Sequence, residues 1–106
     1  MATLSTHVLD TALGRPAEGV RVVLTSAAGD VLGEGQTDAD GRVGRLGPEL
    51  APGDHVLTFA TGAYHAATGQ EGFYPHVAVT FTVGDAEHYH VPLLLNPFGY
   101  STYRGS

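Results

Sequence analysis

Short apolar runs divide the chain, and most of them alternate with polar residues and stop at glycine or proline. The clearest period of two runs from Val77 to Val83, where valine or phenylalanine occupies every second position and alanine or threonine fills the positions between. His55 to Thr61 alternates in a similar way. Such alternation places one face of a strand against a core. The pattern therefore predicts a mostly β protein.

The remaining apolar runs predict further strands, separated by residues that favour turns. The expected strands are Leu4 to Leu9, Val20 to Thr25, Val31 to Thr37, His55 to Thr61, Val77 to Val83, His88 to Leu95 and Tyr100 to Arg104, with a very short strand between Val43 and Pro52. We expect hairpin connections at Ala27 to Asp30, Gly84 to Glu87 and Asn96 to Gly99. Helical character is confined to Tyr64 to Ala67, which predicts one short helix near 63–68.

Seven or eight short strands with this spacing predict an all-β fold, a β-sandwich of two antiparallel sheets. The 106 residues suit a single domain, 1–106, with one core. A sandwich of this size leaves unpaired backbone groups along its strand edges, and pairing with further copies of the chain would satisfy them.

Composition narrows the possible partners. Eleven acidic residues against five arginines and no lysine give a formal charge of −6, which would repel a nucleic-acid backbone. Without cysteine, neither disulfides nor thiolate metal sites stabilise the fold. No run is long and apolar enough to cross a membrane, and the first residues lack a basic segment followed by an apolar one. We therefore expect a cytoplasmic protein with no nucleic-acid or membrane partner.

Histidines are the first candidates for chemistry, because histidine alone titrates near neutral pH without perturbation. His7 lies inside the first expected strand, and His88 and His90, two residues apart, project from one face of another. Arg42 follows Gly41 in an aspartate-rich turn, where a surface charge is the ordinary interpretation. The polar C-terminus carries two tyrosines, which indicates that it packs and delivers Arg104 and Ser106 to a specific place.

The chain resembles the 5-hydroxyisourate hydrolases of the transthyretin-like superfamily in four motifs that occur in the same order. These are Leu4-Ser5-Thr6-His7-Val8-Leu9-Asp10 with Gly14-Arg15-Pro16-Ala17, then Thr37-Asp38-Ala39-Asp40-Gly41-Arg42, then Glu71-Gly72-Phe73-Tyr74-Pro75, and the whole ending from His88 to Ser106. The closing Tyr-Arg-Gly-Ser is the most diagnostic part, and transthyretin itself lacks it. The resemblance covers the chain from end to end.

The resemblance implies a transthyretin-like (prealbumin-like) sandwich that assembles as a homotetramer, a dimer of dimers. It implies that the substrate is 5-hydroxyisourate, that active sites form where dimers face each other, and that no metal or other cofactor takes part. The implied catalytic residues are His7, Arg42 and His90. The implied substrate-binding residues are His7, Arg42, Tyr103, Arg104, Gly105 and Ser106.

These residue types suit hydrolysis of a cyclic amide. A neutral imidazole can accept the proton of an attacking water, so we expect His7 and His90 to share base and acid or water-orienting roles. The permanently charged Arg42 would orient the substrate oxygens and stabilise the developing anion. The product in urate catabolism would be 2-oxo-4-hydroxy-4-carboxy-5-ureidoimidazoline. Sequence alone leaves open which histidine is the base.

Two other interpretations remain open at this point, a zinc hydrolase and a binding module, whereas a calcium loop of the EF-hand kind is excluded. His7, His88 and His90 offer three nitrogen ligands for a zinc hydrolase, although no carboxylate stands out to support them. The Asp38 to Arg42 turn has two aspartates but lacks the further oxygen ligands of a calcium loop. A transthyretin-like carrier or prealbumin-like binding module would explain the strands and the turn, but not the Tyr103 to Ser106 ending.

Overall fold

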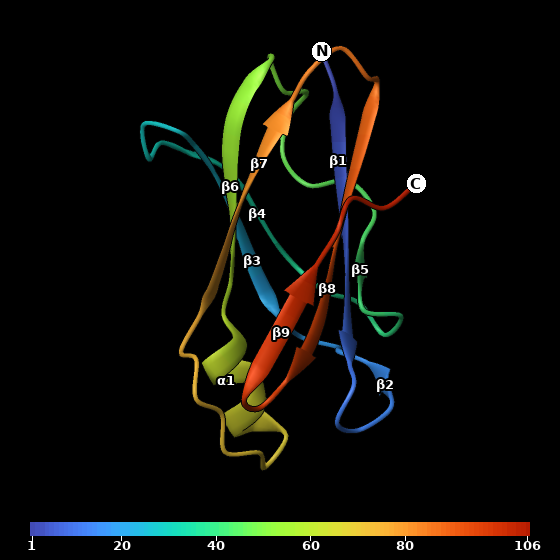
Figure 1. The fold of residues 1–106 in the computed structure, drawn as a ribbon, viewed down its shortest axis with the longest axis vertical. Helices are drawn as coiled ribbons and strands as arrows, with labels where there is room; N and C mark the ends of the chain where they lie inside the picture. The colour runs from blue at the N-terminus through green and yellow to red at the C-terminus, as the bar shows by residue number, and fades with distance from the viewer.

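A computed structural model describes all 106 residues as two facing sheets with one helix at an end of the sandwich (Figure 1). The elements are β1 (Thr3–Asp10), β2 (Arg15–Pro16), β3 (Arg21–Ser26), β4 (Val31–Gln36), β5 (Arg42–Val43), β6 (Gly53–Phe59), α1 (Thr61–Ala67), β7 (Val77–Val83), β8 (His88–Asn96) and β9 (Gly99–Thr102). No helix is long and apolar enough to span a membrane.

Strand β1 organises the five-stranded sheet. On one side it pairs in parallel with β8, which in turn pairs antiparallel with β9. On its other side β1 pairs with two short strands in succession, β5 beside Thr6 and His7 and β2 beside Leu9 and Asp10. The second sheet has four antiparallel strands in the order β4, β3, β6, β7.

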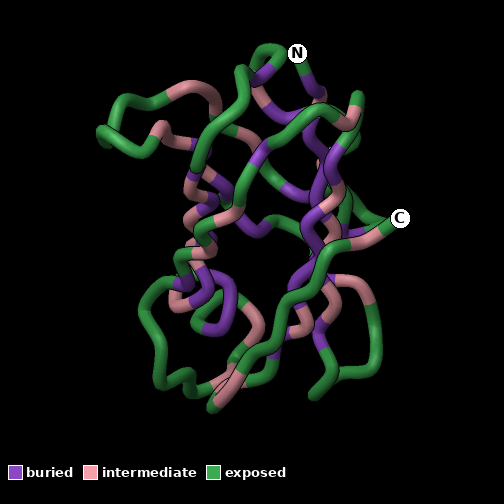
Figure 2. Tube along the Cα trace, turned by 45° about the horizontal axis from the view of Figure 1, so that its top comes forward, coloured by how far each residue is buried: buried purple, intermediate pink, exposed green.

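The core lies between the two sheets, where the buried segments of the trace face each other (Figure 2). It follows from strand alternation, because every second side chain of β1, β3, β6 and β8 points inward. Its largest fully buried apolar side chains are Phe59 and the leucines at positions 4, 24, 46, 50, 57, 93 and 95.

A buried carboxylate ties the helix to this core. Asp10 is 1% exposed and accepts hydrogen bonds from the Tyr64 hydroxyl at 2.6 Å, the Gln70 side chain at 3.1 Å and the backbone N–H groups of Ala12 and Leu13. Burial acts to raise the pKa of Asp10, but these hydrogen bonds outweigh it and the pKa is lowered. The ionised carboxylate therefore fixes α1 against the end of β1.

The sandwich and the short helix expected from the sequence are confirmed, with differences of detail. The structure has nine strands, because Arg15–Pro16, expected as part of a turn, forms a two-residue edge strand. The pair of β1 with β8 is parallel within the otherwise antiparallel arrangement. Thr61, expected to end a strand, instead begins α1, and β9 ends at Thr102.

The hairpin expected at Gly84 to Glu87 is wrong. Strand β7 pairs only with β6, and β8 pairs with β1 and β9, so this connection crosses from one sheet to the other. The turn residues gave the correct break in the chain. They carried no information about the sheet that the next strand joins, because that choice depends on the inward face of β8.

A close backbone approach places β5 against β1. Gly41 has φ = +75°, and its carbonyl accepts the Val8 N–H at 2.7 Å. A Cβ at this position would lie 2.4 Å from the Val8 carbonyl oxygen. Only glycine combines the positive φ with this contact, and the next residue, Arg42, is thereby held opposite His7.

We predict that Gly41→Ala lowers the free energy of unfolding by about 2 kcal/mol or more, from left-handed strain and the clash with β1. Gly44→Ala is the matched control on the other side of β5, because a Cβ there meets nothing within 4 Å. It should change stability by less than about 1 kcal/mol. Urea unfolding of both variants gives the comparison, and equal stability losses would contradict this account of Gly41.

Candidate active site

A row of polar side chains occupies the outer face of the five-stranded sheet. The inward positions of β1 and β8 are filled by the core, so Ser5 and His7 of β1 and His88 and His90 of β8 project outward. The parallel register pairs Ser5 with His90 and His7 with Pro92. The polar groups of two strands far apart in the sequence therefore meet on one surface.

Arg42 joins this surface through β5, whose register makes it the direct partner of His7. The turn before it is ordered by Asp38, which accepts hydrogen bonds from the N–H groups of Asp40 at 2.9 Å and Arg42 at 3.0 Å. The aspartate-rich turn thus has a structural role, capping its own backbone. No third carboxylate or histidine joins Asp38 and Asp40 to form a metal site.

The C-terminus completes a cavity here. The Gly105 N–H donates to the His90 carbonyl at 2.9 Å, and a Cβ at Gly105 would lie 2.5 Å from His90 Cδ2, so glycine is needed for the tail to cross β8. The cavity has a volume of about 260 Å³. It is lined by Ser5, Thr6, Arg42, Val43, Gly44, His88, His90 and Ser106.

A continuous chain of hydrogen bonds runs along its wall. Thr3 Oγ1 lies 2.6 Å from His88 Nδ1, Ser5 Oγ lies 2.9 Å from His88 Nε2, and the same oxygen lies 2.7 Å from His90 Nδ1. Sequence reasoning did not single out Thr3 or Ser5. The available signal was that Thr3, Ser5 and His7 occupy every second position of one strand, because alternation puts these three side chains on one face.

The electrostatics of the cavity keep His90 neutral. Burial lowers the pKa of His90, and the nearby charges of Arg42, His7 and His88 lower it further, while hydrogen bonding with Ser5 partly offsets the effect. A neutral imidazole is the form that accepts a proton. His90 is therefore available as a base at neutral pH.

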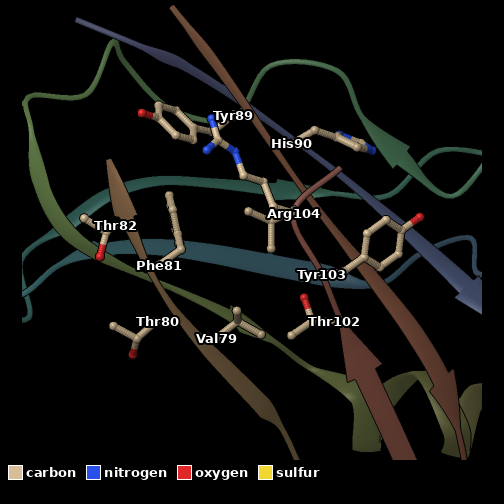
Figure 3. A pocket seen from close by; sticks show the side chains of 10 residues that line it. Val79, Thr80, Phe81, Thr82, Tyr89, His90, Thr102, Tyr103 and Arg104 are labelled. Atoms are coloured by element: carbon tan, nitrogen blue, oxygen red, sulfur yellow. The ribbon is translucent and has the colours of Figure 1, made fainter. Parts of the chain in front are cut away.

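The structure distributes the site residues expected from the sequence between two cavities. Arg42, His90 and Ser106 border the cavity, Gly105 pairs with His90, and His7 lies beside Arg42. Tyr103 and Arg104 instead line a second cavity of about 250 Å³ between β7 and the β8–β9 pair (Figure 3). The Arg104 guanidinium lies 4.8 Å from the centre of the Tyr89 ring, whereas the His90 ring points away from Tyr89. His90 is the residue that both cavities share.

The other histidines lie apart from this surface. His55 faces the core and is hydrogen-bonded through Nδ1 to the Gly53 carbonyl, His65 is buried in α1, and His76 is exposed in the loop before β7. No three histidine, aspartate or glutamate side chains come together as a metal site would require. His88 and His90 are joined through Ser5, so the zinc hypothesis lacks its ligand cluster.

Comparison with known proteins identifies the class to which this fold and site belong. Residues 4–105 match the model of the HIUase/Transthyretin family, so the chain belongs to that family. A 5-hydroxyisourate hydrolase of Salmonella typhimurium is 48% identical over 109 residues, covering 97% of this chain and 80% of that protein.

Solved structures of the same family also match this fold. The 5-hydroxyisourate hydrolase of Klebsiella pneumoniae superposes with a TM-score of 0.94 at 43% identity and covers 100% of both chains. Sea bream transthyretin in complex with thyroxine has a TM-score of 0.89 at 31% identity, covering 96% of this chain and 93% of that one. The identity is thus greater to these hydrolases than to sea bream transthyretin.

Proposed function

We propose that residues 1–106 act as one hydrolase domain that converts 5-hydroxyisourate to 2-oxo-4-hydroxy-4-carboxy-5-ureidoimidazoline in urate breakdown. The observation that carries the proposal is the cavity on the outer face of the five-stranded sheet, where neutral His90 and cationic Arg42 border one space beside His7. The identity of 43% to 48% with hydrolases of this name supports the choice of substrate.

His90 accepts the proton of the attacking water in this proposal. Its Nδ1 is hydrogen-bonded to Ser5, so Nε2 is the nitrogen left for water. His7 holds that water for attack from its position beside Arg42 on the same surface of the sheet. Hydroxide then bonds to the ring carbonyl carbon, and the carbon–nitrogen bond breaks to open the six-membered ring.

Arg42 binds the substrate oxygens and stabilises the negative charge that develops on the attacked carbonyl. Its guanidinium has no carboxylate partner in an ion pair, because the one salt bridge of the structure joins Arg21 to Glu34. Ser106 borders the same cavity and contacts substrate from the tail, with Gly105 beside it. Tyr103 and Arg104 line the second cavity, which shares His90 with the first, and they contribute to binding from that side.

We predict that the protein accelerates the ultraviolet decay of 5-hydroxyisourate generated in situ by urate oxidase. His7→Ala and His90→Ala should lower kcat/KM by about 10²-fold to 10⁴-fold, the range for lost general acid–base catalysis. Arg42→Ala should cost about 10²-fold to 10³-fold, as for a lost oxyanion donor. His76→Ala is the control, an exposed histidine outside both cavities, and should retain full activity.

The pH dependence follows from the lowered pKa of His90. Activity requires neutral His90, and the lowered pKa keeps its imidazole unprotonated to a lower pH than that of an ordinary histidine. A folded parent with a free Ser106 that leaves the decay rate unchanged would contradict the hydrolase. Binding of urate without turnover of its oxidation product would then favour a transthyretin-like carrier.

We further propose that the chain works as a homotetramer, a dimer of dimers, in the cytoplasm. Both sheets end in an open strand, since β7 pairs only with β6 and β9 only with β8. Unpaired edges of this kind favour pairing with a second copy. Large aromatic side chains are exposed near these edges, including Phe98 and Tyr103.

We predict a molar mass in sedimentation equilibrium of four times the 11.0 kDa chain mass. Dilution should produce dimers before monomers, because edge pairing within a dimer buries backbone hydrogen bonds. A mass equal to one chain at every concentration would contradict the assembly.

A further inference from the structure

The hydroxyl of Ser5 has no part in the chemistry proposed above, yet it lies between two histidines. Ser5 is 9% exposed, and its Oγ is within hydrogen-bonding distance of His88 Nε2 at 2.9 Å and His90 Nδ1 at 2.7 Å. His88 is exposed and continues the chain to Thr3 Oγ1 at 2.6 Å. A hydroxyl has one proton, so it donates to one imidazole and accepts from the other.

The hydrogen bonds of Thr3, at the exposed end of this series, determine which group donates and which accepts in each of the others before reaction. Thr3 Oγ1 donates to the Glu87 carbonyl at 3.5 Å, which leaves it to accept the Nδ1–H of His88. His88 Nε2 then accepts the Ser5 hydroxyl proton, and Ser5 accepts the Nδ1–H of His90. In this state His90 presents an unprotonated Nε2 to the cavity, as a base must.

We propose that Ser5 and His88 form a proton relay for His90, in which the Ser5 hydroxyl transfers protons between the two imidazoles and His88 holds the positive charge. This inference rests on the proposed hydrolytic function, because the proton in question comes from the attacking water. His88 and Ser5 border the same cavity, and in this scheme they act on His90 as positioning and relay residues.

The proton transfers balance at each stage. His90 Nε2 takes a proton from water as the hydroxide oxygen bonds to the substrate carbonyl carbon. The Nδ1 proton of His90 passes to Ser5 Oγ, and the Ser5 proton passes to His88 Nε2. His90 remains neutral, and His88 becomes a cation whose two N–H groups donate to Thr3 and Ser5.

The second half of the reaction reverses these transfers. His90 Nε2–H gives its proton to the departing ring nitrogen as the carbon–nitrogen bond breaks. The Ser5 proton returns to His90 Nδ1, and the Nε2 proton of His88 returns to Ser5. The chain is restored to its starting state, and no proton has been exchanged with solvent.

The electrostatics of the two histidines explain why a relay is useful. His90 is partly buried, and desolvation together with repulsion from Arg42, His7 and His88 makes a positive charge on its ring unfavourable. His88 is exposed to water, where a cation is solvated at little cost. Moving the charge from His90 to His88 thus removes an unfavourable charge from beside Arg42.

The test compares Ser5→Ala, which breaks the relay, with His88→Gln, which keeps a hydrogen-bonding group beside Ser5 but cannot hold a proton. Both should lower kcat by about 10-fold to 100-fold, a loss typical of groups that support a catalytic residue, with KM within about twofold of the parent. Ser5→Thr restores a hydroxyl and should recover much of the rate. Thr11→Ala, which removes a remote hydroxyl bonded to the Leu95 carbonyl, should keep parental kcat.

The pH profile separates a relay from a purely structural role. The relay couples the protonation of His90 to Ser5 and His88, so His88→Gln and Ser5→Ala should each change the acid limb of the kcat profile, whereas Thr11→Ala should not. Parental kcat in both variants would overturn the proposal. Loss in Ser5→Ala with full activity in His88→Gln would also overturn it, leaving Ser5 as a group that only orients His90.

A readout without turnover keeps this test independent of the proposed function. In nitrogen-15 spectra of the histidine rings, Ser5→Ala should change the Nδ1 signal of His90 and the Nε2 signal of His88 together. Thr11→Ala should leave both unchanged. An inactive parent that shows these coupled changes contradicts the hydrolase but retains the hydrogen bonds from His88 through Ser5 to His90, whereas unchanged ring signals in Ser5→Ala overturn the relay whatever the activity.

Discussion

The parallel pairing of β1 with β8 is the constraint on which both the core and the site depend. Eight residue pairs in register join the N-terminal strand to a strand more than eighty residues later. Leu4 and Val8 face the core with Leu93, while Ser5 and His90 meet on the opposite face. A slip of one residue would exchange the two faces of β1, removing the core and the site together.

The remaining parts of the site depend on segments that pack against β1 and β8. Gly41 lies against β1 and positions Arg42, and Gly105 lies against β8 and positions Ser106. In both places a glycine lets the backbone approach the strand more closely than any other residue could. The residue that follows each glycine borders the cavity. A hydrogen bond between Ser5 Oγ and Nδ1 then orients the ring of His90, which borders the cavity. The chemistry thus depends on sheet register more than on loop conformation.

Much of the fold followed from local pattern, because strand alternation is set by burial on one face. The alternation from Val77 to Val83 is that of β7, and glycine at position 41 has the expected positive φ. The resemblance to the hydrolase family pointed to His7, Arg42 and His90 as catalytic residues, and the sheet brings these three to one surface. The pairing of β1 with β8 was beyond local reasoning, since neither strand indicates its neighbour.

The same limit explains what the sequence did not reveal about the site. A serine in a strand resembles any other small polar residue, so the contacts of Ser5 became evident only with the register of β8. Tyr103 and Arg104 belong to the same terminal motif as Ser106 but lie toward the other cavity. Strand β9 ends at Thr102, and the later residues no longer alternate as a strand.

The most direct test of the account is to find which cavity binds the substrate rings. Nuclear magnetic resonance can follow a titration with urate, which keeps the fused rings but is not hydrolysed by this reaction. Binding at the outer face of the five-stranded sheet predicts saturable shifts in the ring signals of His7 and His90 and in the Ser106 amide. Shifts confined to Val79 and Phe81, which line the cavity between β7 and β8, would contradict the placement of the active site.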